Sequence, residues 1–289
     1  MQYVWRVLIP EMGYSCSFVM HGILTVAALH KAYLIPSERE MFLDLAASYS
    51  NAGLETFRAT LHLIDNDNWE NYFGFASLVV LYVSALPVRN SKNTNVVASF
   101  FELFLFVRGI RTLLATFEEG VGRTKFAPFA HSVWIVDPDD EETSKNAPLD
   151  RSPLPRDVYE ALQGLSSFYE DNLQGDSRGD YVAAVKDLRR SINLMAYAGI
   201  NIEIGMLLFW PYVISENVMA DIQAQNPYAI LLLCYFSVLL CALEQRYWFL
   251  KGWSRRLFGI SDERLKEHPA LAEMAKWPRR QVSELYGTP

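Results

Sequence analysis

Cysteine is scarce in this 289-residue sequence, which holds only three. Cys234 and Cys241 are seven residues apart in one apolar segment, hence on one helix face, and Cys16 lies in another apolar segment. This pattern favours free, buried thiols in a reducing compartment over disulfides. The first residues make a poor signal peptide, because Arg6 interrupts the apolar run and Pro10 follows early. The sequence therefore predicts an intracellular protein, in the nucleus or the cytoplasm.

Basic residues are outnumbered by acidic ones. The chain has 26 Lys and Arg against 33 Asp and Glu, which gives a net charge of −7 and a pI near 5.3. A surface that binds nucleic acid needs clustered Lys and Arg to neutralise phosphates. We therefore expect no direct nucleic-acid binding by this chain.

Strand signals are nearly absent. The sequence shows no convincing alternation of apolar and polar residues and no Asn-Gly or Asp-Gly hairpin. Instead, apolar residues recur three and four positions apart, as on one face of an α-helix. No fixed internal repeat is visible, so a solenoid is not expected. The sequence predicts an all-α protein in which residues 1–289 form a single large bundle of about ten to twelve helices.

The longest hydrophobic run is Tyr228–Leu243, where every residue is apolar except Ser237. A helix without a polar face is buried on all sides. The run is sixteen residues long and is followed by Glu244, whereas a membrane span needs roughly 20 apolar residues. We therefore predict a central core helix and no membrane span.

The periodicity and the turn signals predict the other helices. Ser37 and Glu40 have the spacing of a capping box at the start of the second helix. Residues 118–155, rich in proline and acidic residues, are expected to form a long irregular excursion. The helices are expected over Tyr14–Leu34, Ser37–Ile64, Trp69–Leu86, Val96–Phe117, Pro155 to about Gly199 with a break at Gln174–Asp180, Asn201–Ile222 with a kink or an end at Pro211, a short segment from Ser261, and Met274–Val282.

Motifs of metal and cofactor chemistry are missing. His21 and His30 are nine residues apart, too far to place two ligands on one helix face. The acidic run Asp137–Glu142 has the composition of a magnesium-binding aspartate cluster, but its position between prolines favours a solvated loop. There is no nucleophile elbow, P-loop or dinucleotide fingerprint. We expect no metal site and no cofactor.

Four ionisable side chains occur inside apolar helices: Glu102, Arg108, Glu203 and Glu244. An unpaired buried charge costs several kcal/mol, so each is expected to be paired, neutralised or at the surface. Arg108 or Arg111 could pair with Glu102, and Arg246 with Glu244. Glu203 has no obvious local partner, so in a cavity its pKa would rise and it could donate a proton or a hydrogen bond.

Three ordered blocks of sequence carry a resemblance to a known family. They are FVMHGILTVAALHKAYLIP at Phe18–Pro36 with AGLETFRATL at Ala52–Leu61 and FGFASLVVLYVSALP at Phe73–Pro87; LFVRGIRTLL at Leu105–Leu114; and YWFLKGWSRRLFGI at Tyr247–Ile260 with MAKWPR at Met274–Arg279. Together they resemble the C-terminal regulatory domain of fungal zinc-cluster transcription factors, most closely the sterol-uptake-control branch. The resemblance covers the chain from Tyr14 onward.

The resemblance implies an all-helical bundle that encloses an apolar cavity for a sterol-like or terpenoid ligand. Aromatic side chains in buried helices suit the wall of such a cavity, and Tyr or Trp would orient the ligand with their polar tips. His21 matches a position of the family. The predicted ligand-binding residues are His21, Tyr82, Glu102, Phe104, Arg108, Phe209, Trp210, Tyr235 and Trp248.

The sequence differs from the family in one respect. No basic segment with six cysteines precedes the region that resembles the regulatory domain. Three interpretations stay open, and the first two are a sensor piece of a transcription factor and a stand-alone, cofactor-independent cyclase or isomerase of fungal secondary metabolism. In the second case Glu203 is the predicted catalytic residue. A helical interaction module with a filled core is a third reading. The oligomeric state is open between a monomer and a homodimer.

Overall fold

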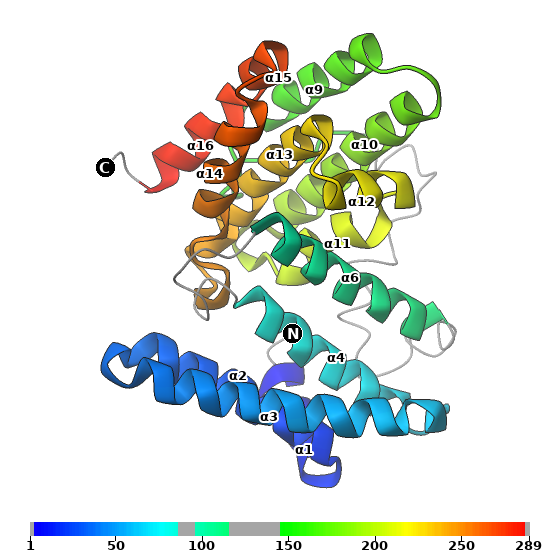
Figure 1. The fold of residues 1–289 in the computed structure, drawn as a ribbon, viewed down its shortest axis with the longest axis vertical. Coiled ribbons are helices and arrows are strands. Elements are labelled where there is room, and N and C mark those ends of the chain that lie inside the picture. The colour runs from blue at the N-terminus through cyan, green and yellow to red at the C-terminus, as the bar shows by residue number, and fades with distance from the viewer. Residues whose placement is uncertain (1–2, 86–95, 116–144, 287–289) are drawn as a thin grey trace. The chain divides into compact units, whose positions relative to one another are not determined.

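The computed structural model describes residues 3–85, 96–115 and 145–286, and these residues form helices joined by turns, with no strand among them (Figure 1). The all-α prediction is confirmed. Their contacts gather into two compact units, unit 1 (Met1–Thr94 and Glu102–His131) and unit 2 (Asn95–Phe101 and Ser132–Pro289). The prediction of a single domain stays a prediction.

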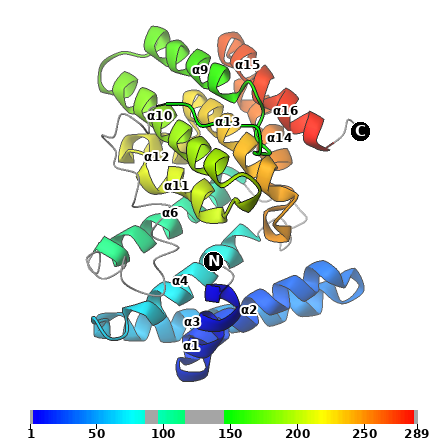
Figure 2. The ribbon, with the colours of Figure 1, turned by 180° about the vertical axis from the view of Figure 1, so that it is seen from behind.

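Unit 1 is built on a hairpin of two long helices, α2 and α3, which lie side by side in both ribbon views (Figures 1 and 2). Helices α1 and α4 pack against α2. The unit comprises η1 (Val4–Leu8), α1 (Ile9–Ser15), α2 (Ser17–Leu34), η2 (Pro36–Glu38), α3 (Arg39–Thr60), η3 (Leu61–Leu63), α4 (Trp69–Ser84) and the greater part of α6 (Val96–Ala115).

Two glycines allow α4 to approach the hairpin closely. A Cβ atom at Gly22 would lie 2.9 Å from Leu78 Cδ1, and one at Gly53 would lie 2.8 Å from Phe75 Cε2. The missing side chains leave room for an aromatic cluster in which Phe75 lies 5.5 Å from Phe18 and 5.1 Å from Phe57, measured between ring centroids. This cluster fixes α2, α3 and α4 relative to one another.

Helix α13 (Pro227–Glu244) is the central helix of unit 2. It packs against α10, α11, α12, α14, α15 and α16. Every residue of α13 from Ala229 to Glu244 is buried, so the predicted central helix is confirmed. The other elements are α9 (Val158–Asn172), α10 (Gly175–Ala198), η5 (Gly199–Asn201), α11 (Ile204–Val213), α12 (Glu216–Gln223), η6 (Trp248–Leu250), α14 (Trp253–Leu265), α15 (Pro269–Met274) and α16 (Lys276–Tyr286).

Among the described residues, α13 is the helix that is by itself long and apolar enough to cross a membrane, and 89% of its span is buried in the protein. Helices α2 and α3 pass the same test only as a pair bent by 119°. Length and composition of this kind are shared by core helices of globular proteins, and α13 has the burial of such a helix.

The described part of the predicted excursion, residues 145–155, contains turns and bends but no helix, as expected. Its backbone is held by the buried amide of Asn193 in α10. Asn193 Oδ1 accepts from the Ala147 N–H at 3.1 Å, and Nδ2 donates to the Lys145 carbonyl at 3.1 Å. The rest of the excursion, including the acidic run, lies outside the described residues.

Several predicted boundaries are wrong. Ser37 belongs to the 3₁₀ turn η2, so it does not stand at a helix N-cap, and no side-chain cap precedes α3. The first predicted helix breaks at Cys16, whose backbone is extended. The predicted break at Gln174–Asp180 shrinks to two residues, because α10 begins at Gly175 with φ +60° and Arg178 Nε donates to the Leu173 carbonyl.

Candidate ligand pocket

Unit 1 contains a pocket of about 600 Å³ between helices α3, α4 and α6. This volume lies within the range of roughly 300 to 1,000 Å³ that is usual for small-molecule sites. The wall is almost entirely apolar. It is formed by Leu54, Phe57, Leu61, Ile64, Phe75, Ala76, Val79, Glu102, Leu105, Phe106, Gly109, Ile110 and Thr112.

Helix α6 contributes one continuous face to the pocket. Its lining residues Glu102, Leu105, Phe106, Gly109 and Ile110 follow the spacing i, i+3, i+4, i+7 and i+8. Residues at this spacing share one side of an α-helix. Leu105 is 51% exposed, which is unusual for a large apolar residue and follows from its position on the open pocket wall.

The opposite wall is held by aromatic contacts and a hydrogen bond. Phe57 and Phe75 are part of the aromatic cluster of unit 1, and Tyr72 extends it with a ring centroid 5.5 Å from that of Phe57. The Tyr72 hydroxyl donates to the Thr60 carbonyl at 2.7 Å, which holds the end of α3 just before the lining residue Leu61. Because these contacts already order the wall, less ordering entropy is lost when a ligand binds.

Open space in the pocket is clearest at Gly109. A Cβ atom at this position would have no heavy atom within 4 Å, although Gly109 lies in the middle of α6. Glycine in a helix interior costs about 0.5 to 1 kcal/mol relative to alanine. The absence of a side chain at Gly109 therefore enlarges the pocket at the expense of helix stability.

Polar groups are few in the pocket wall. Thr112 donates its hydroxyl to the Arg108 carbonyl at 3.3 Å. Glu102 forms no hydrogen bond or ion pair with any residue that the structure describes. The side chain of Arg111, one of its predicted partners, lies outside the described residues.

Glu102 is the one predicted site residue that lines this pocket. On the neighbouring parts of unit 1, Phe104 is fully buried, and Tyr82 and Arg108 are half-buried outside the lining. The half-buried His21 ring stacks on Tyr49 with 6.3 Å between ring centroids, and its Nδ1 is buried without a hydrogen-bond partner.

The predicted aromatic residues of unit 2 have packing contacts there. Phe209 is buried, and Trp248 meets Phe249 edge to face at 5.7 Å between centroids. Trp210 stacks on Phe236 at 4.8 Å and donates its indole N–H to the Ala184 carbonyl at 2.9 Å. Tyr235 stacks on Trp277 and donates to the Met274 carbonyl. Their role in ligand binding stays a prediction.

The structure supplies Glu203 with the partner that the sequence did not reveal. The Tyr247 hydroxyl, from the segment after α13, lies 3.1 Å from Glu203 Oε2 and 3.1 Å from the Ile202 carbonyl. Burial, reinforced by the charge of Glu203, raises the pKa of Tyr247 to about 12, so the phenol remains a donor. Glu203 does not line the pocket.

The predicted pairing of Glu244 with Arg246 is wrong. The Glu244 carboxylate is 2% exposed and accepts from two backbone N–H groups, Gly252 at 3.0 Å and Ser254 at 2.7 Å. These N–H groups open helix α14 and have no partner within the helix. Arg246 instead donates to the Ile200 carbonyl.

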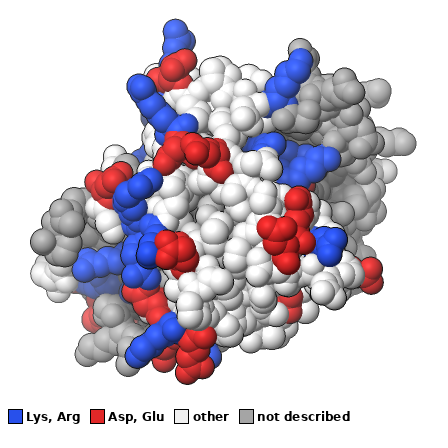
Figure 3. All heavy atoms as spheres, turned by 90° about the horizontal axis from the view of Figure 1, so that it is seen from above, with Lys and Arg blue, Asp and Glu red and all other residues white. Residues whose placement is uncertain are grey.

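The three cysteines are free. Burial raises the pKa of Cys234 and of Cys241 to about 12, so both thiols stay protonated at neutral pH. Within the described residues, no cluster of His, Cys, Asp or Glu could hold a metal ion. The face of the molecule shown in Figure 3 carries basic and acidic side chains intermingled, not a continuous basic patch.

Most of the residues that line the pocket were not predicted from the sequence. Leu54, Phe57 and Leu61 follow the spacing i, i+3 and i+7 from the amphipathic helix α3 into η3, and this stripe was visible in the sequence. Periodicity shows that such residues share a face but not which neighbour that face meets. The glycine that opens the pocket carries no sequence signal of its own.

Comparison with known proteins found no matching family profile and no matching solved structure. The chain is 20% identical over 274 residues to a Zn(2)-C6 fungal-type transcription factor of Gibberella zeae, and this match covers 89% of the chain and 52% of that protein. The chain therefore spans about half the length of the curated relative that it matches. Along most of its sequence, this chain is distantly related to part of a fungal zinc-cluster transcription factor.

Proposed function

We propose that this chain is a regulatory domain that binds a small apolar molecule, of sterol-like or terpenoid class, in the pocket between α3, α4 and α6. The observation that carries the proposal is the apolar pocket of about 600 Å³. An apolar wall with few polar groups is the usual design of a small-molecule site, because burial of apolar surface provides the affinity.

The distant relationship to a zinc-cluster transcription factor supports a regulatory role. In this proposal the occupied pocket changes the activity of a transcription factor, and the chain acts in the nucleus or the cytoplasm. The alternative of a cyclase or isomerase stays a prediction, because its proposed proton donor Glu203 lies outside the pocket lining.

The test is the binding of dehydroergosterol, a fluorescent sterol, to the wild type and to Gly109→Phe. A phenyl ring at position 109 projects into the open pocket, where a Cβ meets no other atom. Saturable binding to the wild type is expected, with a dissociation constant at least about tenfold higher in the variant, equivalent to 1.4 kcal/mol.

The matched control is Gly164→Phe. Gly164 is also an exposed glycine within a helix, α9, and a Cβ there also meets no atom within 4 Å. This control should bind like the wild type, and circular dichroism should show that both variants keep their helices. Equal binding by Gly109→Phe and the wild type would show that the sterol does not occupy this pocket.

A further inference from the structure

One charged group stands in the otherwise apolar pocket wall. Glu102 begins the lining face of α6, and the next lining residues along that face are Leu105 and Phe106. No described residue pairs with its carboxylate. An ionised carboxylate only accepts hydrogen bonds, so a ligand group beside Glu102 must be a donor.

Glu102 lies at one end of an apolar stretch. Thr112, the last lining residue of α6, is ten residues further on, which corresponds to roughly 15 Å along the helix axis. The wall between them on α6 is formed by Leu105, Phe106, Gly109 and Ile110. This arrangement fits an elongated apolar molecule with its polar head at Glu102.

Glu102 is the charged residue of the pocket lining, and its side chain is exposed. Arg108, the nearest described cation on α6, is not part of the lining. An anionic head group at Glu102 would therefore meet like charge without gaining a hydrogen-bond donor from this part of the lining.

We infer that the pocket selects its ligand by the head group: it takes an amphiphile whose hydroxyl or ammonium group donates to Glu102, and it rejects a carboxylate of the same length. The inference rests on the proposed apolar binding in this pocket. Discrimination of this kind comes from an unfavourable charge contact with the wrong ligand as well as from a hydrogen bond to the right one.

The test uses three probes with the same twelve-carbon chain, dodecylamine, dodecanol and dodecanoate, each kept below the concentration at which it aggregates or separates from solution. They compete at pH 7.5 and moderate salt with Nile red, a neutral apolar dye bound to the full chain. The amine and the alcohol should displace the dye at concentrations at least about tenfold lower than dodecanoate, a 1.4 kcal/mol difference.

Glu102→Gln removes the charge and keeps the shape of the side chain. In this variant the amine and the carboxylate should differ by less than about threefold, equivalent to 0.7 kcal/mol. Glu55→Gln is the control, because Glu55 is an exposed glutamate of α3 beside the lining residue Leu54 but not in the lining. It should keep the full discrimination, which separates the local effect of Glu102 from the net charge of the protein.

The outcomes distinguish the inference from the function on which it rests. Equal displacement by all three probes in the wild type, or full discrimination retained in Glu102→Gln, would overturn the role of Glu102 and leave apolar binding intact. Failure of the wild type to bind Nile red, together with no effect of Gly109→Phe on dehydroergosterol, would overturn the proposed function itself.

Discussion

At the scale of single residues, Glu244 is a buried carboxyl group that links two helices. It ends the fully buried helix α13, and its carboxylate receives the first N–H groups of α14. Burial raises the pKa of Glu244, while the two backbone donors oppose that rise. The residue therefore joins two helices through a group that is costly to ionise.

This pKa shift has a predictable effect on stability. A carboxyl group whose pKa is raised by folding stabilises the protein below its unfolded pKa, near 4.5, and this contribution is lost as pH rises through the folded pKa. The stability of the wild type relative to Glu244→Gln should therefore fall as the pH rises above 4.5. Urea unfolding at a series of pH values measures the difference.

Glu244→Gln should also be less stable overall, by about 1 to 3 kcal/mol, because the amide NH₂ faces one of the buried N–H donors. Glu263→Gln, on the exposed surface of α14, is the matched control and should give only a small difference in stability. A stability difference for Glu244→Gln that grows toward neutral pH would contradict the stated sign.

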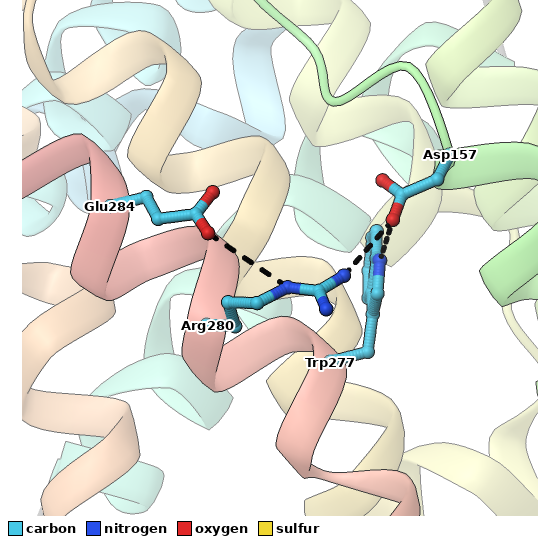
Figure 4. Close-up of polar contacts among 4 residues, drawn as sticks. All are labelled: Asp157, Trp277, Arg280 and Glu284. Carbon is cyan, nitrogen blue, oxygen red and sulfur yellow. Dashed lines mark hydrogen bonds and ion pairs between the residues drawn. The ribbon is translucent and has the colours of Figure 1, made fainter.

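At the scale of elements, α16 is held to the start of α9 by a polar cluster shown in Figure 4. Asp157, the N-cap residue of α9, does not cap its own helix. Its Oδ2 accepts instead from Trp277 Nε1 at 2.9 Å and from Arg280 at 3.1 Å, while Glu284 lies 3.9 Å from Arg280 Nε (Figure 4). The cluster links residues 120 positions apart in the chain.

The two contacts of Asp157 should differ in strength. Loss of the part-buried Trp277 bond in Asp157→Ala should cost about 1 kcal/mol, within the usual range for a hydrogen bond. The Arg280 pair is exposed and should contribute less than about 1 kcal/mol. Hydrogen exchange of the α16 amides should accelerate in Asp157→Ala and change less in Arg280→Ala.

Lys276→Ala serves as the control for α16, because its ion pair with Glu273 is highly exposed. A larger loss of stability in Arg280→Ala than in Asp157→Ala would show that the ion pair, not the indole hydrogen bond, attaches the helix.

At the scale of the whole molecule, α6 contributes residues to the cores of both units. In unit 2, Phe100 is fully buried, 4.3 Å from Trp253 and 6.4 Å from Phe236 between ring centroids. From Glu102 onward the same helix lines the pocket of unit 1. Since a helix is cooperative along its length, loss of its first turns weakens the turns that follow.

We therefore propose that the chain unfolds as one domain, in a single transition. Phe100→Ala should lower the stability by about 3 to 5 kcal/mol, as for other large cavities in a core, and should lower it for both units together. Scanning calorimetry should give equal calorimetric and van't Hoff enthalpies. Two separate transitions, with only the one of unit 2 shifted by Phe100→Ala, would contradict the single domain.

Particular residues show which features of the fold could be predicted from the sequence and which could not. The continuous apolar run of α13 predicted a core helix correctly, because a helix with no polar face can only be buried. The start of α14 was predicted eight residues late, at Ser261 in place of Trp253, because its first N–H groups are satisfied by Glu244 from another helix. The predicted capping box at Ser37 and Glu40 does not form. Ser37 lies instead in the 3₁₀ turn that begins at Pro36, so a local sequence motif was not sufficient to specify the local structure.

By itself, the sequence determined the helical class, the central helix and the free cysteines, because these depend on composition and on periodicity along the chain. Only the tertiary structure decided which apolar stripes meet in unit 1 and leave a pocket open at Gly109. It also decided which carboxylates find donors, since the partners of Glu203 and Glu244 come from other segments. A pocket and a buried hydrogen bond are both formed between elements, and periodicity within one element does not specify its neighbour.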